Sequence, residues 1–256
     1  MSINIRRLEE IKKIATASRA VAKTLNYLTE QIKPDITTKE LNTLAEDFIK
    51  NLGGRPAFKG LYGFPDGVCI SVNEVIIHGI PDSYKLKEGD IVGLDIGVEI
   101  DGWYGDAAKT VGVGKISSAD RDLINCSYDT LMHAIDIIHE GMRFKELSHE
   151  IEQFILKRGF VPLRGYCGHG IGRRPHEEPE VPNYLDGKNQ NQGPKIKEGM
   201  VFCIEPMICC KSGKPKVLND NWAVVSDDGL RGSHWEHTIA IVNKKAKILS
   251  IDDMEE

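Results

Sequence analysis

Residues 94–110 read LDIGVEIDGWYGDAAKT, and this stretch predicts the central β-hairpin of the fold. Asp101 and Gly102 form a preferred two-residue turn, so residues paired across the hairpin should have numbers that sum to 203. This register places Asp106 diagonally opposite Asp95 on one face of the hairpin, about 7 to 8 Å away. Apolar residues alternate with them: Val92, Leu94, Ile96, Val98 and Ile100. We therefore expect one apolar face and one face that carries two carboxylates.

Two carboxylates this close repel each other unless a positive charge lies between them, and a divalent cation would supply it. For this pair alone, a solvated hairpin explains the pattern equally well, because the chain contains 38 acidic residues. Two later acids favour the cation. Glu205 ends the apolar run 201–204, where an unpaired acid would be costly to bury, and Glu236 alternates with Thr238 along a strand-like segment.

The chain also contains two unequal copies of one motif. Lys39-Glu40-Leu41 and Phe48-Ile49 recur 106 positions later, Lys87-Glu88-Gly89 before Asp95 recurs 110 later before Glu205, and Gly102 before Asp106 recurs 130 later before Glu236. Two copies are too few for a solenoid. We expect them to pack face to face about a pseudo-twofold axis on which the four acids converge.

Helical and strand-like patterns alternate in the order helices, sheet, helices, sheet, which predicts an α+β fold. Helices are expected at 5–31, from a Thr37 cap to Gly53, at 118–140 and at 143–158, with inserted loops at 182–195 and 211–221. The sheet would be antiparallel and covered by the two helix pairs. The 256 residues should form a single catalytic domain with halves of about 1–117 and 118–250.

Composition narrows the class of protein. With 41% hydrophobic and 28% charged residues the chain has the composition of a globular protein, and its net charge of -5 argues against a nucleic-acid surface. No apolar run is long enough for a secretion signal or a membrane span. Six cysteines lack metal-site or disulfide spacing, so we expect reduced, mostly buried thiols and a cytoplasmic protein.

His169 is a further candidate metal ligand beside the four acids. It lies in the run 166–172, YCGHGIG, whose glycines would let the backbone crowd a metal while the imidazole binds it. One nitrogen with many carboxylate oxygens suits a pair of Mn, Fe(II), Co or Zn ions better than one structural zinc. Two such ions activate water and polarise a carbonyl, which is hydrolytic chemistry.

These elements resemble the type I methionine aminopeptidases, whose fold is called pita-bread, over essentially the whole chain. The stretches that carry the resemblance are 64–81 (FPDGVCISVNEVIIHGIP), 94–110, 168–179 (GHGIGRRPHEEP), 204–206 (IEP) and 235–238 (WEHT). The resemblance implies five metal ligands: Asp95, Asp106, His169, Glu205 and Glu236. It implies that Asp106 and Glu236 bridge both metals and that Glu205 is also the general base.

By the same resemblance, His78 and His176 bind substrate beside the scissile amide. His176 could donate to the tetrahedral oxyanion, and His78 could help to deliver a proton to the leaving amine. The methionine pocket falls on Phe64, Cys69 and Trp222, where sulfur against aromatic rings suits methionine. The chain departs from many bacterial relatives at Phe58, Leu61 and Pro175, so the shape of the pocket and its inhibitor preference stay open.

The implied substrates are peptides and nascent chains that begin with methionine and have a small second residue. Such substrates imply transient ribosome contact, although no residue pattern marks that surface, and we expect a monomer. Type I is favoured because the first helix begins close to Met1, which leaves no room for a zinc-finger extension. Prolidases and aminopeptidase P share the ligand pattern but would have a further amino-terminal domain. A metal-free binding module would have lost a ligand.

Overall fold

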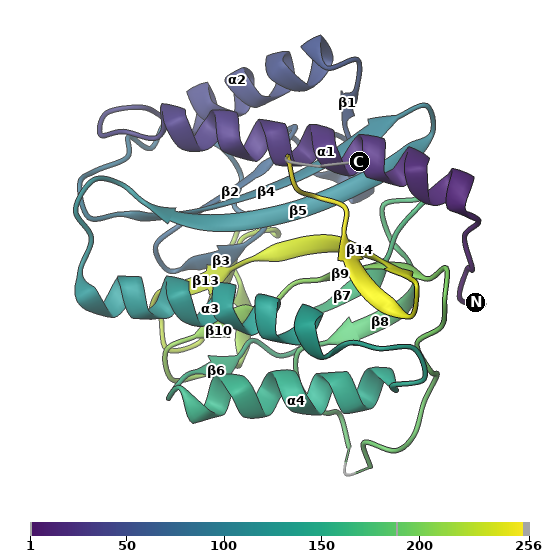
Figure 1. Ribbon diagram of the computed structural model, residues 1–256. Coiled ribbons are helices and arrows are strands. Elements are labelled where there is room, and N and C mark those ends of the chain that lie inside the picture. Colours follow the sequence, from purple (N-terminus) through teal and green to yellow (C-terminus); the bar gives the residue numbers. More distant parts are fainter. Residues whose placement is uncertain (1, 188, 253–256) are drawn as a thin grey trace.

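The computed structural model describes residues 2–187 and 189–252. Its main sheet is antiparallel and has nine strands (Figure 1). Along the main path lie β1 (Arg55–Pro56), β4 (Ile91–Ile100), β5 (Trp103–Gly112), β14 (Glu236–Val242), β9 (Val201–Ile204), β7 (Cys167–Gly170) and β8 (Glu177–Pro182), while β2 (Cys69–Val72) pairs with β4 and β15 (Lys245–Ile248) with β14. Strands from the two parts of the chain therefore meet where β5 pairs with β14.

Two three-stranded sheets flank the main one. One sheet contains β13 (Gly232–His234), β10 (Met207–Cys209) and β6 (Val161–Pro162). The other contains β11 (Pro215–Val217), β12 (Val224–Ser226) and β3 (Val75–Ile77). The prediction of a loop over 211–221 is wrong for β11, because its residues pair with β12. In the loop expected at 182–195, the described residues after Pro182 contain no helix or strand.

Four helices pack in two pairs on the main sheet (Figure 1). The pairs are α1 (Leu8–Gln31) with α2 (Thr38–Asn51), and α3 (Ser118–Ile137) with α4 (Phe144–Lys157). Each of α2 and α4 has 14 residues. As expected, Thr37 caps α2, accepting a hydrogen bond from the Glu40 amide. The predicted α+β order is confirmed.

Two predicted helix ends are wrong because hydrogen bonds to distant backbone hold the flanking residues outside the helix. The first helix begins at Leu8 instead of residue 5, since the Arg6 amide donates to the Gly199 carbonyl at 2.7 Å and Arg7 is extended. The third helix ends at Ile137 instead of residue 140, since the Glu140 amide donates to the Lys244 carbonyl at 3.1 Å. Neither long-range contact is visible in local periodicity.

The hairpin register is confirmed at every pair from Ile91 with Gly112 to Ile100 with Trp103, and the paired numbers all sum to 203. Val92, Leu94, Ile96 and Val98 are buried against α1 and α2. Helices α3 and α4 bury a second apolar cluster over β9 and β14. The start of α1 lies between these two cores, because Ile11 and Ile14 pack against Val201 and Ala240.

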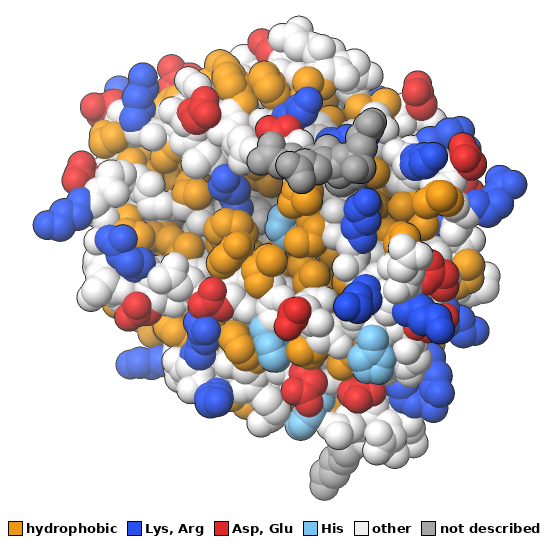
Figure 2. Space-filling view, viewed as in Figure 1, with side chains coloured by type: hydrophobic (Ala, Val, Ile, Leu, Met, Phe, Trp, Pro, Cys, Tyr) orange, Lys and Arg blue, Asp and Glu red, His pale blue; other side chains and the backbone are white. Residues whose placement is uncertain are grey.

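The surface in the view of Figure 1 mixes acidic and basic side chains around apolar ones (Figure 2). None of the described helices combines the length and the apolar run that a bilayer crossing requires.

Candidate metal centre and active site

The acidic face of the sheet is organised around one alanine. Ala108 of β5 pairs with Asp95 of β4 on one side and with Glu236 of β14 on the other. Asp106 lies two residues earlier on β5, so it shares the face of Ala108. Because the alanine side chain is short, the flanking carboxylates can lean over it. One oxygen each from Asp95, Asp106 and Glu236 lies within 4.8 Å of the other two.

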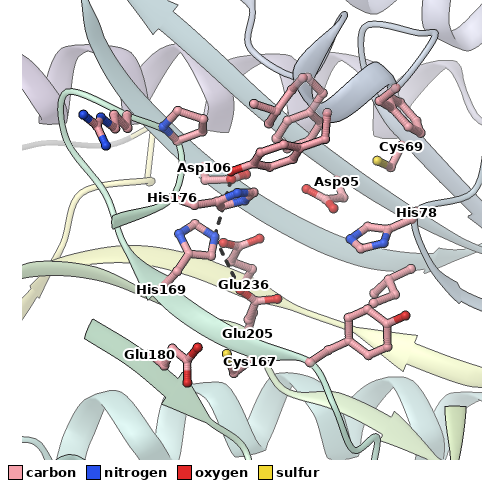
Figure 3. A pocket seen from close by; sticks show the side chains of 18 of the residues that line it. Cys69, His78, Asp95, Asp106, Cys167, His169, His176, Glu180, Glu205 and Glu236 are labelled. Carbon is pink, nitrogen blue, oxygen red and sulfur yellow. Dashed lines mark ion pairs between the residues drawn. The ribbon is translucent and has the colours of Figure 1, made fainter. Parts of the chain in front are cut away.

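Glu205 and His169 close the group from the neighbouring strands (Figure 3). Glu205 follows directly after β9, and His169 lies in β7. The Nε2 atom of His169 is 3.5 Å from Oε1 of Glu205 and 4.0 Å from Oδ2 of Asp106. The five residues named as ligands in the sequence analysis therefore meet on one face of the sheet.

The backbone fixes the orientation of His169. Its Nδ1 lies 3.1 Å from the Gly170 carbonyl, so Nδ1 carries the proton and the Nε2 lone pair faces the carboxylates. The flanking glycines are required by contacts with neighbouring backbone. A Cβ at Gly168 would collide with the Cys203 carbonyl, and one at Gly170 with the Glu178 carbonyl. These glycines therefore admit neighbouring backbone on both sides of His169.

The electrostatics of the buried acids are unfavourable without a cation. Burial raises the pKa of Asp95 to about 7. Burial, followed by the charges of neighbouring acids, raises the pKa values of Asp106, Glu205 and Glu236 well above the ordinary range. Burial and the nearby His176 lower the pKa of His169 to about 3, which keeps its imidazole neutral.

Three carboxylate oxygens are also available to bind a cation. Oδ1 of Asp95, Oδ1 of Asp106 and Oε1 of Glu236 are buried without a hydrogen-bond partner among the described residues. Buried polar atoms in folded proteins are normally satisfied, and a metal ion would satisfy these three. One imidazole and four carboxylates are hard or borderline ligands, which suit Mn, Fe(II), Co or Zn.

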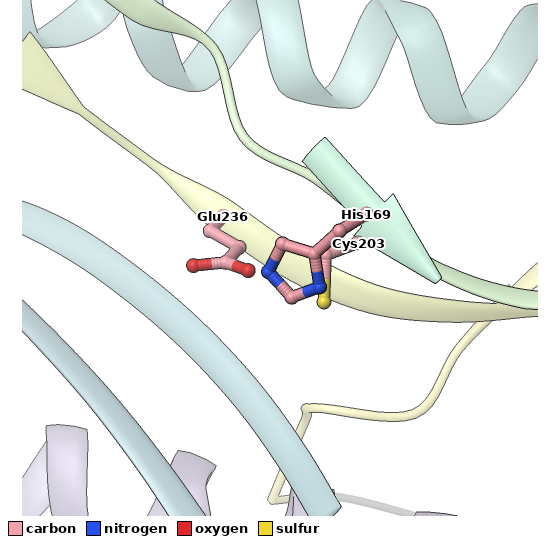
Figure 4. Close-up of side chains that lie close together, drawn as sticks. All are labelled: His169, Cys203 and Glu236. Atoms are coloured by element: carbon pink, nitrogen blue, oxygen red, sulfur yellow. The ribbon is translucent and has the colours of Figure 1, made fainter. Parts of the chain in front are cut away.

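A second group of possible ligand atoms contains Cys203 together with His169 and Glu236 (Figure 4). The Cys203 sulfur lies 3.5 Å from the Thr238 hydroxyl and is fully buried. Burial, then the charges of Glu236 and Asp106, raises the pKa of this thiol well above its ordinary value. Without a cation this side chain is therefore a neutral thiol, whereas metals bind the thiolate.

Two further histidines lie beside the acids. His176 makes an edge contact with His169 at 4.4 Å between ring centroids and stacks on Tyr62 at 5.8 Å. His78 has a positive φ of 58°, an uncommon conformation that is often found at functional sites. Burial and then the charge of His176 lower the pKa of His78 to about 4, and burial lowers that of His176. Both rings are therefore neutral at pH 7.

The five candidate ligands line one cavity of about 760 Å³ together with His78 and His176. The ten predicted site residues that line it are Phe64, Cys69, His78, Asp95, Asp106, His169, His176, Glu205, Trp222 and Glu236. Phe64 meets Trp222 edge-on, with their ring centroids 5.1 Å apart. The three departing residues Phe58, Leu61 and Pro175 line the cavity too. The cavity thus joins an apolar pocket to the acidic cluster.

Two further residues of this site, His234 and Tyr62, are not predicted from the sequence. Nε2 of His234 lies 3.9 Å from Glu205 and 4.0 Å from Glu236, and this buried nitrogen has no hydrogen-bond partner among the described residues. Its position two residues before Glu236 could have indicated it, because alternate strand residues share a face. Tyr62, at the cavity mouth, is 75% exposed, and no sequence pattern marked it.

Comparison with known proteins agrees with this geometry. Residues 12–243 match the model of metallopeptidase family M24. A methionine aminopeptidase of Helicobacter pylori is 59% identical over 251 residues, which cover 98% of this chain and 99% of that protein. The crystal structure of methionine aminopeptidase from Rickettsia prowazekii has a TM-score of 0.94 and 35% identity, with 98% of this chain and 100% of that chain covered.

A prolidase from Pyrococcus furiosus is also similar, with a TM-score of 0.79 and 25% identity, but only 66% of that longer chain is covered, against 98% of this one. The expected pita-bread fold is confirmed by these structural matches. The chain belongs to metallopeptidase family M24.

Proposed function

We propose that this chain is a methionine aminopeptidase of the type I class, which hydrolyses the first peptide bond of chains that begin with methionine. The observation that carries the proposal is the single cavity in which an apolar pocket adjoins five clustered metal-ligand side chains. The relatives that cover nearly the whole chain have the same activity in their names. The proposal includes one catalytic domain with halves of about 1–117 and 118–250.

Asp95, Asp106, His169, Glu205 and Glu236 would hold two divalent ions. The buried, unpartnered oxygens of Asp95, Asp106 and Glu236 support this assignment. When bound, the ions would activate water and polarise the scissile carbonyl. Glu205 would accept the proton of the attacking water on a carboxylate oxygen and later return it to the leaving amine. His169 keeps its Nε2 directed at this group through the Nδ1 contact with Gly170.

The two neutral histidines would bind the peptide. A neutral imidazole can donate one hydrogen bond, which His176 would direct at the oxygen that becomes negative in the transition state. His78 would hydrogen-bond the amide nitrogen and help its protonation. Phe64, Cys69 and Trp222 would enclose the methionine side chain, since thioethers pack well against aromatic rings.

The biological substrate would be a nascent chain with a small second residue. We accordingly propose a cytoplasmic monomer that contacts the ribosome transiently. Mn, Fe(II), Co and Zn all suit the ligand set, and metal availability rather than raw affinity would select among them.

Peptide hydrolysis distinguishes the proposed methionine aminopeptidase activity from prolidase activity. Purified protein would be incubated with Met-Gly-Met-Met and with an Ala-Pro peptide, each with and without a chelator. Release of free methionine only in the presence of metal is the expected result. Cleavage before proline alone would favour a prolidase, and binding without cleavage of either peptide would favour a non-catalytic module. Metal analysis of protein purified without added salts identifies the ions.

A further inference from the structure

The residues that precede α1 form an extended strap against the part of the chain that carries His176. Arg6 occupies a slot formed by two glycines, with its side chain against Gly172 and its backbone against Gly199. A Cβ at Gly172 would collide with its guanidinium, and a Cβ at Gly199 would lie 2.7 Å from the Arg6 carbonyl oxygen. Since any other residue at these two positions would crowd Arg6, the slot is shaped to receive the strap.

Inside the slot, Arg6 forms an ion pair with Glu177. The two side chains are only 9% and 8% exposed, respectively. The same Glu177 oxygen accepts a hydrogen bond from Asn4 at 2.7 Å. Its other oxygen accepts the amides of Arg173 at 2.8 Å and Arg174 at 3.1 Å. One carboxylate therefore ties the strap to the turn at 172–176.

The same turn is held on its other side by Trp103, which is 2% exposed. The Arg173 guanidinium lies 4.0 Å from the Trp103 ring centroid, and that of Arg6 lies 5.6 Å from it. In addition, the Tyr104 amide donates to the Gly172 carbonyl at 2.9 Å. The turn is thus clamped between the strap and the tip of the β4–β5 hairpin.

His176 ends this turn, directly before Glu177. Its ring contacts are an edge contact with His169 and a stack on Tyr62, which is itself 75% exposed. An exposed tyrosine is a weak restraint, so the position of the His176 ring depends mainly on its backbone. The backbone that leads to it is held by the Glu177 carboxylate, which accepts the amides of Arg173 and Arg174.

We propose that Arg6 and Glu177 are positioning residues for His176: the buried ion pair holds the turn 172–176 so that the imidazole meets the substrate in the correct place. This inference rests on the proposed aminopeptidase function. Neither Arg6 nor Glu177 needs to touch the reacting atoms. A shift of about 1 Å in a positioning group can cost on the order of a hundredfold in rate, so a broken pair should lower kcat by roughly tenfold or more.

The test compares Arg6→Met and Glu177→Gln with Arg7→Met. Arg7 is a matched control because it is the adjacent arginine, is 85% exposed and pairs only with Glu10 among the described residues. We expect Arg6→Met and Glu177→Gln to lower kcat roughly tenfold with unchanged metal content, and Arg7→Met to leave kcat unchanged. Arg6→Lys should recover part of the loss, because a shorter cation can still reach the carboxylate.

Combination with His176→Ala separates positioning from general destabilisation. If the pair acts through His176, Arg6→Met should lower kcat much less in the His176→Ala background than in the wild type. Equal losses in both backgrounds would overturn the proposal, as would wild-type kcat in a folded Glu177→Gln variant. If the wild-type protein itself releases no methionine, the proposed function fails instead.

Hydrogen exchange gives a readout that does not depend on activity. The Arg173 and Arg174 amides should exchange faster in Arg6→Met than in wild type or Arg7→Met, because their acceptor is no longer held. Unchanged exchange at both amides would refute the link between strap and turn. If Arg6→Met does not fold, kcat and hydrogen exchange can be measured in Arg6→Lys and Glu177→Gln, which are smaller perturbations.

Discussion

When a chelator has removed the metals, the free energy of unfolding of this protein should fall as the pH rises from 4 to 8. The folded chain holds Asp95 with a pKa of about 7, against an ordinary value of 3.8. Below pH 3.8 the carboxyl is protonated in both the folded and the unfolded chain, so it has no effect there. Between these two pKa values the unfolded chain ionises while the folded chain keeps its proton, and stability falls.

The size of the loss follows from the shift. About three pKa units at about 1.4 kcal/mol each give roughly 4 kcal/mol for Asp95, fully lost above pH 7. Asp106, Glu205 and Glu236, whose pKa values are also raised well above their ordinary values by burial and by neighbouring acids, add to the decline. With metals bound, the folded carboxylates are ionised and the decline should disappear, because the cations replace the protons.

Urea unfolding followed by tryptophan fluorescence measures this, with and without chelator, at several pH values from 4 to 8. The chelated Asp95→Asn variant should be more stable than chelated wild type at pH 7.5 by roughly 4 kcal/mol, and equal to it near pH 4. Asp47→Asn is the control, since Asp47 is 67% exposed and lies outside the cavity. If chelated Asp95→Asn and wild type unfold at the same urea concentration at pH 7.5, the carboxylate is not destabilised by burial and the reasoning fails.

Four substitutions, at Asp106, Glu236, His176 and Ala108, test the site itself. Asp106→Ala and Glu236→Ala should each abolish methionine release and lower the amount of bound metal, as measured by elemental analysis. Full metal content in either variant would contradict the assignment of the substituted residue as a ligand. His176→Ala should lower kcat by about a hundredfold or more with metal content unchanged, because it removes one oxyanion donor, and equal loss of metal would refute that role. Ala108→Leu should weaken metal binding by roughly tenfold to a hundredfold in calorimetric titration. The larger side chain would overpack the space between Asp95 and Glu236, which costs about 1–3 kcal/mol. The smaller change Ala108→Ser should leave metal binding close to that of the wild type.

Local chemistry determines the features that the sequence predicts well. The turn Asp101-Gly102 fixes the hairpin register, so the relation between Asp95 and Asp106 follows without any tertiary information. Thr37 with Glu40 marks the start of α2 in the same way. Each of these signals lies within a few residues and does not depend on the rest of the chain.

Contacts between distant segments explain what the sequence does not show. The apolar period continues to residue 5, yet the helix begins at Leu8, because the slot beside Gly199 holds Arg6 in an extended strap. The role of Ala108 needs the pairing of β5 with β14, which joins residues 128 positions apart, from Ala108 to Glu236. Likewise, the fold is needed to bring the buried Nε2 of His234 to 3.9 Å from Glu205.

The distribution of the proposed ligands along the chain has a consequence for stability. Asp95 and Asp106 come from the β4–β5 hairpin, while His169, Glu205 and Glu236 come from strands that follow α4. Neither set alone provides the five side chains, so the metals would bind only when both parts of the sheet are joined at β5 and β14. A ligand that binds only the folded state stabilises it by mass action. The metals would therefore act as a cross-link between β5 and β14, and the same four acids that destabilise the chelated sheet would stabilise the loaded one.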